Sequence, residues 1–137
     1  MSDSRTSLPW DKAVLIFENI FGRMGVDSFQ NVLIDGGRAH QVYSTEETAL
    51  LIQPFQGMNH FRHQCEELLL LRKRLMSLEE TDVNVLPAIY FSDSSEAHKI
   101  ASRKGVAKIT PNNMGAFKRY FTRSLKRRER KRRTEMQ

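Results

Sequence analysis

The stretch that decides the fold is residues 31–53, NVLIDGGRAHQVYSTEETALLIQ, which predicts three consecutive strands joined by tight turns. Asp35, Gly36 and Gly37 interrupt it first, because Asp-Gly and Gly-Gly pairs supply the positive φ that a tight hairpin requires. The last part is an unbroken apolar run that ends at Gln53, which predicts burial on both faces at the centre of a sheet. We expect the strands at residues 29–34, 39–43 and 48–53.

Successive side chains of the second strand point to opposite faces of the sheet. This alternation places His40 and Val42 on one face of the sheet. Gln41 and Tyr43 then lie on the other face. Glu18, in the helix that precedes the strands, lies beside the apolar face of that helix. Its carboxylate is therefore either an ordinary boundary group or one that reaches a neighbouring element.

The remaining elements are helices and strands in alternation. Asp93 and Glu96 form a capping box that opens a short helix, and Pro87 places its strand near an edge or at a bulge. Together the elements predict an α/β (α+β) fold, a mixed sheet flanked by helices. The expected elements besides the three strands are a helix over 11–24, a leucine-rich helix over 59–78 capped by Asn59, a strand over 83–91, the short helix ending at Gly105, a strand over 106–110 and a C-terminal helix from Asn112 or Asn113.

The leucine-rich helix carries more apolar side chains than one interface needs. Residues 68–71 are four consecutive leucines. We therefore expect the sheet to cover one side and a further element, such as a second subunit, to cover another. A homodimer or a protein partner is a corresponding expectation.

Length and composition predict one domain in a reducing compartment. The chain has 137 residues and a single cysteine, Cys65, so no internal disulfide is expected. The N-terminal residues do not show the pattern of a secretory signal, and no apolar run reaches the roughly 18 residues of a membrane span. We expect an intracellular, cytoplasmic protein with a disordered segment at 1–9, a domain at 10–125 and a basic tail at 126–137.

Charge is distributed unevenly along the chain. From residue 118 onward there are ten basic and two acidic residues, so this segment carries +8 of a total net charge of +6 and the rest carries −2. Such asymmetry predicts a phosphate-binding arm whose contacts are salt-dependent and largely blind to sequence. A solvated terminus, an acidic membrane surface and an acidic protein partner are the alternatives. The basic residues are Lys118, Arg119, Arg123, Lys126, Arg127, Arg128, Arg130, Lys131, Arg132 and Arg133.

His60, His63 and Cys65 form the other chemically suggestive cluster. Residues three apart share a helix face, but a fourth ligand is not evident, whereas zinc sites usually show ligand pairs at both ends. The place of Cys65 on the leucine face predicts burial rather than reactivity. We therefore expect no metal at this cluster.

Four runs of sequence resemble the Mrr-like restriction endonucleases of the PD-(D/E)xK superfamily. They are FENIFGRMG at 17–25, IDGG at 34–37, LLIQPF at 50–55 and PAIYFSDSSEAHKIASRKGVAKIT at 87–110. The similarity spans about residues 17–117 and implies a restriction-endonuclease-like sheet. It also implies that remnants of the catalytic set are Glu18, Asp35 and Gln53.

The chain departs from the pattern of that family at two positions. The second acidic residue of the family falls on Ala39, or on His40 if the register slips by one, and the lysine falls on Phe55. Nucleases of this kind use a divalent metal held by carboxylates and a lysine that stabilises charge on the phosphate. Ala39 and Phe55 supply neither function, so Mg²⁺ or Mn²⁺ is expected only if catalysis survives.

The sequence therefore predicts a non-catalytic, nuclease-like pseudoenzyme that binds nucleic acid, DNA rather than RNA, through its basic tail. One alternative is an interaction subunit that docks a partner on the leucine-rich helix. A second is a Mg²⁺- or Mn²⁺-dependent endonuclease with an atypical site at Asp35 and Glu18.

Overall fold

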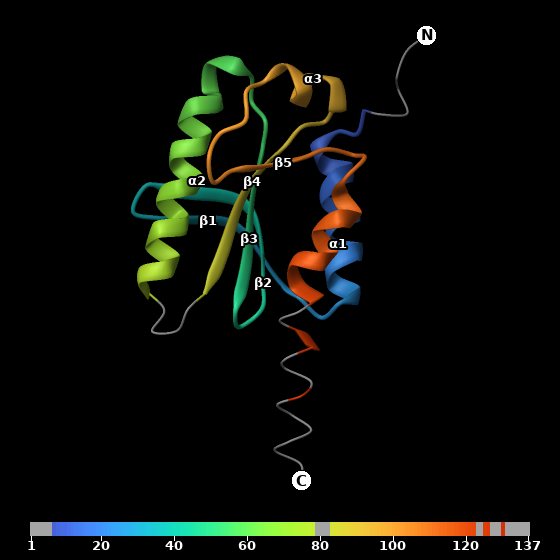
Figure 1. Ribbon diagram of the computed structural model, residues 1–137, viewed down its shortest axis with the longest axis vertical. Coiled ribbons are helices and arrows are strands. Elements are labelled where there is room, and N and C mark those ends of the chain that lie inside the picture. The colour runs from blue at the N-terminus through green and yellow to red at the C-terminus, as the bar shows by residue number, and fades with distance from the viewer. Residues whose placement is uncertain (1–6, 79–82, 123–124, 127–129, 131–137) are drawn as a thin grey trace.

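The computed structural model describes residues 7–78, 83–122, 125–126 and 130. It is a mixed α/β structure in which one sheet separates two helical layers (Figure 1). The elements are α1 (Trp10–Arg23), β1 (Asp27–Ile34), β2 (Gly37–Ser44), β3 (Thr48–Pro54), α2 (Met58–Leu78), β4 (Asn84–Tyr90), α3 (Ser94–Lys99), β5 (Ala107–Ile109) and the 3₁₀ helix η1 (Met114–Phe117). Residues 118–122 continue from η1 as α-helix.

The five strands lie in the order β1-β2-β3-β4-β5. The first three form an antiparallel meander, and β4 and β5 join it in parallel. The strand β3 lies at the centre, and all its residues from Thr48 to Gln53 are buried. The expected central, doubly covered strand is confirmed.

Each face of the sheet carries its own core. On one face α1 and the helical residues 118–122 pack together, with Phe17, Phe21 and Phe121 fully buried between them and the sheet (Figure 1). On the other face α2 lies across the strands, with Leu68 and Leu71 buried against them. A side chain that points from the sheet to α1 is therefore separated by the sheet from one that points to α2.

The Asp-Gly-Gly turn joins β1 to β2 as expected. Asp35 and Gly36 have φ values of 47° and 89°, and Ile34 pairs with Gly37 across the two-residue loop. Positive φ at both loop positions is the hairpin geometry that Asp-Gly favours. Gly37 is required for another reason, because a Cβ built there would lie 2.4 Å from the backbone nitrogen of Leu71. The hairpin is thus a place where α2 lies close to the sheet backbone.

Two of the four consecutive leucines of α2 lie near other segments of the chain. A Cβ at Gly36 would lie 3.5 Å from Leu70, and one at Gly105 would lie 3.4 Å from Leu69. The hairpin tip and the loop before β5 therefore lie beside the helix. Leu69 and Leu70 are half-buried there, whereas Leu78 at the end of α2 is 67% exposed.

Three details differ from the sequence-based expectations. The helix α3 ends at Lys99, not Gly105, because Ile100 takes an extended conformation and is buried in the core on the α2 side. The helix α2 begins at Met58, so Asn59 lies in its first turn and is not its cap. The strand β4 is internal, and Pro87 is tolerated because β5 pairs with β4 only from Ala88 onward.

The expected alternation in β2 is also wrong at one point. His40 contacts Trp10 of α1, with ring centroids 6.2 Å apart, whereas Val42 packs in the core on the α2 side. The cause lies in β1, where Asn31 has a φ of 51° between the pairs Gln30–Gln41 and Val32–Ala39. This distortion turns the strand pair, so that His40 and Gln41 border the same hollow near α1.

Candidate functional site

Glu18 lies on α1 and faces the sheet. Its Oε1 accepts a hydrogen bond of 3.3 Å from the hydroxyl of Tyr43, a fully buried residue of β2. Burial raises the pKa of Tyr43 far above its ordinary value, and the nearby Glu18 carboxylate raises it further. The structure therefore gives Glu18 a neutral tyrosine as its partner, on the α1 face of the sheet.

Asp35 lies at the tip of the β1–β2 hairpin. Its side chain is 71% exposed, and its Oδ2 is 3.8 Å from Nε of Arg74 on α2. An exposed pair of this length contributes little to stability. The residue acts as the first loop position of the hairpin.

Gln53 ends the buried run of β3 and points to α2. Its Nε2 donates to the backbone oxygen of Arg38 at 2.9 Å, and its Oε1 accepts from Nε2 of Gln64 at 2.9 Å. Gln64, which is 1% exposed, also donates to the oxygen of Pro54 and accepts from the backbone nitrogen of Gln56. Both amides are thus occupied in fixing the end of β3 to α2.

The three predicted catalytic remnants do not converge. Glu18 lies on the α1 face of the sheet, whereas Gln53 contacts α2 on the opposite face. The α2 partners of Asp35 and Gln53, which are Arg74 and Gln64, are ten residues apart, or about 15 Å along the helix. Magnesium requires several hard oxygen ligands in one octahedral shell. These residues do not fit such a site.

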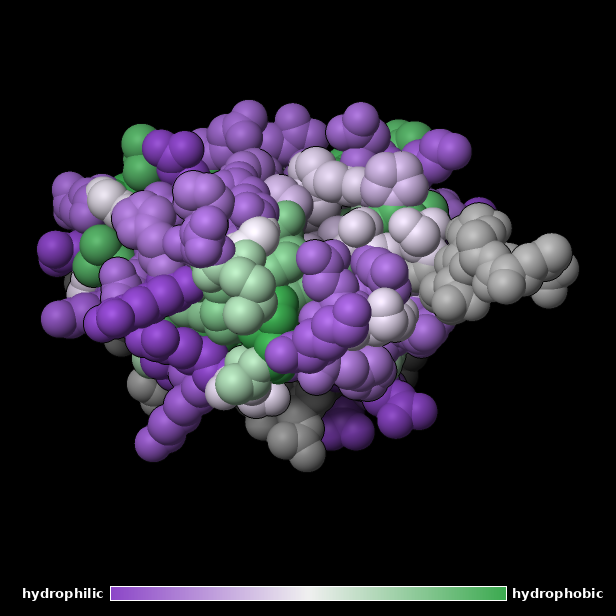
Figure 2. Space-filling view, turned by 90° about the horizontal axis from the view of Figure 1, so that it is seen from above, coloured by the Kyte–Doolittle hydropathy of each residue, from purple (hydrophilic) through white to green (hydrophobic). Residues whose placement is uncertain are grey.

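The two positions that depart from the nuclease pattern are packed with apolar groups. Ala39 is fully buried beneath α2. Phe55 lies 4.6 Å from Phe91 and 6.1 Å from Phe61 between ring centroids. Figure 2, seen from above the view of Figure 1, shows an apolar patch framed by hydrophilic residues on the side of the molecule where α2 begins. Ala39 and Phe55 thus stand where the nuclease pattern has an acidic residue and a lysine, and both pack against apolar neighbours.

The cysteine and a histidine of the run at residues 60–65 differ in burial. Cys65 is fully buried, and burial raises the pKa of its thiol, whereas the His63 side chain is 71% exposed and lies 3.7 Å from Glu67. Within the described residues, no group of three or more His, Cys, Asp or Glu side chains is arranged to hold a metal ion.

The beginning of the basic segment is docked on the body. Phe121 is fully buried, with its ring 5.3 Å from that of Phe21 on α1. The Tyr120 hydroxyl donates to the backbone oxygen of Asn84 at 2.8 Å, at the start of β4. Two aromatic side chains therefore fix this helix to α1 and to the sheet, while Lys118 and Arg119 are exposed on its outer side.

The structure describes only part of the basic segment. Lys118, Arg119, Lys126 and Arg130 are all helical and exposed. The other tail residues of the prediction lie outside the described residues; they are Arg123, Arg127, Arg128, Lys131, Arg132 and Arg133.

One basic residue near this helix was missed by the sequence analysis. Arg72 of α2 donates from Nε to the backbone oxygen of Val85 at 3.1 Å, and its charge acts on Tyr120. Arg72 lies near the C-terminal helix because α2 and that helix both pack beside β4. Local sequence does not encode this tertiary arrangement. Glu46 and Glu47 are also exposed at this end of the sheet, so the surface there is mixed in charge.

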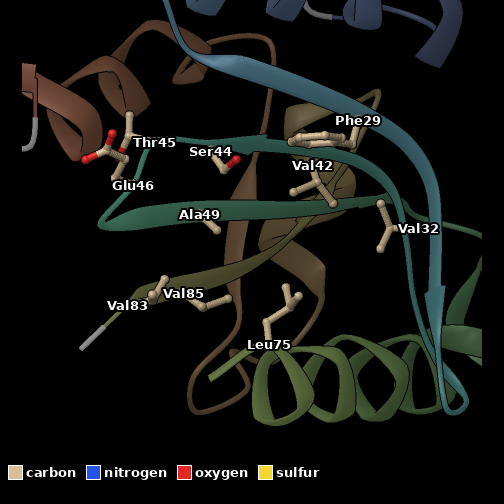
Figure 3. Close-up of a pocket in the computed structure, with 10 residues that line it drawn as sticks. All are labelled: Phe29, Val32, Val42, Ser44, Thr45, Glu46, Ala49, Leu75, Val83 and Val85. Atoms are coloured by element: carbon tan, nitrogen blue, oxygen red, sulfur yellow. The ribbon is translucent and has the colours of Figure 1, made fainter. Parts of the chain in front are cut away.

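An apolar pocket of about 250 Å³ opens between the sheet and the C-terminal part of α2 (Figure 3). Val42 and Ala49 extend into it from the sheet, and Leu75 extends from α2. Phe29, on the edge strand β1, is 52% exposed at its rim. The pocket presents few polar groups and offers binding surface rather than catalytic chemistry.

Comparison of the chain with protein-family models, with curated proteins and with solved structures finds no match. In the described part of the chain, no helix is long and apolar enough to cross a membrane.

Proposed function

We propose that this protein binds nucleic acid, and duplex DNA in particular, without cleaving it. The basic C-terminal segment makes the phosphate contacts, and the body holds that segment in place. The frame of the body is proposed to be a restriction-endonuclease-like one in which the catalytic positions have been filled by structural residues. The proposal rests mainly on one observation, the separation of aromatic and basic side chains on the C-terminal helix.

That separation supports binding because it combines an anchor with a charged face. Phe121 and Tyr120 fix the helix to the core and to β4. Lys118 and Arg119 remain exposed. A helix attached in this way can hold cations at fixed positions, whereas a free terminus would lose more conformational entropy on binding. The ten basic residues from Lys118 onward give such a surface enough charge to displace counterions from a duplex.

The amide network around Gln53 supports the non-catalytic part of the proposal. A glutamine that serves a metal needs a free oxygen, but Oε1 of Gln53 accepts from Gln64. Glu18 lies on the other face of the sheet, where it accepts from Tyr43. The contact of Gln53 joins β3 to α2, and the contact of Glu18 joins α1 to β2, so both residues have structural roles.

Binding to a labelled 20-base-pair duplex, followed by fluorescence anisotropy, tests the proposal. The full chain is expected to bind, and a chain cut after Leu125 is expected to lose most of its affinity. Leu125 packs against the α1-side core, so this cut leaves the docked part of the helix intact. Circular dichroism of the shortened chain provides the check on folding. Equal affinity of the two chains would contradict the proposed role of the tail.

The alternative, a protein-interaction subunit, retains one supporting observation. Leu70 lies near the hairpin and Leu69 near the loop before β5, so these two leucines are not a free docking face. The apolar pocket beside Leu75, with Met76 and Leu78 exposed nearby, is the surface on which such a partner would bind. Copurification of a stoichiometric protein, together with no affinity for DNA, would favour this alternative.

A further inference from the structure

A hollow of about 300 Å³ lies between the first turn of α1 and the β1–β2 strand pair. We name it the Trp10 hollow after the indole that borders it. Apart from the tryptophan, its wall is mostly polar, with three carboxamides, one carboxylate and one imidazole. The aromatic and polar lining residues are Trp10, Asp11, Gln30, Asn31, His40 and Gln41.

Two polar atoms of residues that line this hollow are buried without a hydrogen-bond partner among the described residues. They are Oε1 of Gln41 and Nδ1 of His40. Gln41 is only 5% exposed. A buried acceptor that receives no hydrogen bond destabilises the folded state, and native proteins rarely retain one without a reason. The two adjacent residues are brought to this one hollow by the positive φ of Asn31 in the opposite strand.

The chemistry of the wall narrows the class of ligand. Burial lowers the pKa of His40, and the charge of Arg38 lowers it further, so the imidazole is neutral at pH 7 and can accept a hydrogen bond. Gln41 presents an oxygen acceptor beside an amide N–H donor. A carboxamide of this kind matches a base edge that places a donor beside an acceptor, such as N6 and N7 of adenine. The indole adds an aromatic surface of the kind on which bases stack.

We propose that the Trp10 hollow binds an unpaired nucleobase, such as adenine, through the carboxamide of Gln41 and the indole of Trp10. The base can belong to a strand or to a free nucleotide, since the recognised chemistry is the same. For the strand, the inference rests on the proposed binding of nucleic acid. The base is held at the α1 end of the molecule, whereas Tyr120 docks the basic helix at the start of β4.

Trp10 is the only tryptophan of the chain, so its indole N–H gives a single, assigned signal in a ¹H–¹⁵N spectrum. The full-length protein is titrated with adenosine, with cytidine and uridine, with ribose, and with oligo(dA) beside an abasic strand of equal length. Adenosine and oligo(dA) are expected to shift the Trp10 signal. Ribose and the abasic strand are expected to leave it unchanged.

Gln41→Leu removes the carboxamide at similar volume and is expected to weaken adenosine binding by about tenfold or more. Gln56→Leu, at an exposed position elsewhere, is the matched control and is expected to leave binding unchanged. The dispersion of the full spectrum shows whether each variant is folded. If Gln41→Leu unfolds the chain, Gln41→Glu keeps the shape and replaces the amide donor by an acceptor.

The outcomes separate this inference from the proposed function. A shift by adenosine that persists when tail arginines are replaced by glutamine supports the hollow independently of the tail. No shift with adenosine or oligo(dA), an equal shift with ribose, or unchanged binding in the folded Gln41 variants would overturn the inference. Duplex binding through the tail could still hold in each of these cases.

Discussion

The side chains of Gln53 and Gln64 form a buried amide pair, in which Nε2 of Gln64 lies 2.9 Å from Oε1 of Gln53. This pair joins the end of the central strand to α2. Because Gln64 also donates to the backbone oxygen of Pro54 and accepts from the backbone nitrogen of Gln56, its removal would take a partner from three buried or partly buried groups. Each such group left unpaired costs about 1–3 kcal/mol.

Gln64→Leu is therefore expected to lower the free energy of unfolding by about 2–4 kcal/mol. Urea denaturation followed by circular dichroism measures the change. Gln56→Leu serves as the control, because the Gln56 side chain is exposed, and surface changes usually alter stability by about 0.5 kcal/mol or less. Equal stability of the two variants would show that the amide pair does not hold strand and helix together.

Gly37→Ala is expected to destabilise the fold strongly. Its new Cβ would lie 2.4 Å from the backbone nitrogen and 2.6 Å from the Cα of Leu71, so a helix would have to move. Overpacking of this kind typically costs about 1–3 kcal/mol, occasionally more. Thermal unfolding measures the decrease in stability.

Gly22→Ala provides the opposite control for the glycine prediction. Gly22 lies within α1, and a Cβ there meets nothing within 4 Å. Alanine is favoured over glycine in helices by about 0.5–1 kcal/mol, so this variant should be slightly more stable. A Gly37→Ala protein as stable as Gly22→Ala would contradict the close approach of α2 to the hairpin.

Stability is expected to fall in alkaline solution. Burial raises the pKa of Tyr90 and of Tyr120 to about 12, above the ordinary value of 10.0. The folded state therefore holds these protons more tightly than the unfolded chain, and the stabilisation is complete below pH 10 and lost as pH rises toward 12. Denaturation at a series of pH values should show a smaller alkaline decline for Tyr90→Phe than for the wild type. An unchanged decline would show that Tyr90 titrates alike in both states.

Cleavage of plasmid DNA is not expected with either Mg²⁺ or Mn²⁺. Glu18 and Gln53 lie on opposite faces of the sheet, and Asp35 is at an exposed hairpin tip. Agarose electrophoresis of supercoiled plasmid with each metal provides the measurement. Metal-dependent nicking that disappears in Asp35→Ala would restore the endonuclease alternative.

Much of the fold follows from local sequence. The Asp35-Gly36 loop, the central strand and the order of helices and strands were predicted from turn chemistry and periodicity, and they are confirmed. The role of Gly37 was not predictable, because it depends on α2, which is distant in the sequence. The shared face expected for His40 and Val42 was wrong for a related reason, since the strand pair is distorted at Asn31 in the neighbouring strand.

The end of α3 illustrates the same limit. Sequence favoured a helix to Gly105, but the chain becomes extended at Ile100. There Lys108 of β5 donates from Nζ to the backbone oxygens of Ala97 and Ile100, and Ile100 enters the core. These interactions come from a later strand. For the candidate site, the resemblance to the Mrr-like nucleases pointed to Glu18, Asp35 and Gln53. That Glu18 and Gln53 lie on opposite faces of the sheet could be known only from the structure.

The salt dependence of DNA binding tests the central claim most directly. Two full-length variants each replace four basic residues by glutamine: one in the tail, at Arg127, Arg128, Lys131 and Arg132, and one on exposed positions of the body, at Lys12, Lys99, Arg103 and Lys104. Their net charges are equal, so nonspecific effects of total charge cancel.

The logarithm of the binding constant is measured against the logarithm of salt concentration for both variants and for the wild type. If the tail holds phosphates, the slope should decrease by about 0.9 for each phosphate that the tail variant no longer neutralises, and it should remain unchanged in the body variant. Equal slopes for the two variants would contradict binding through the C-terminal segment.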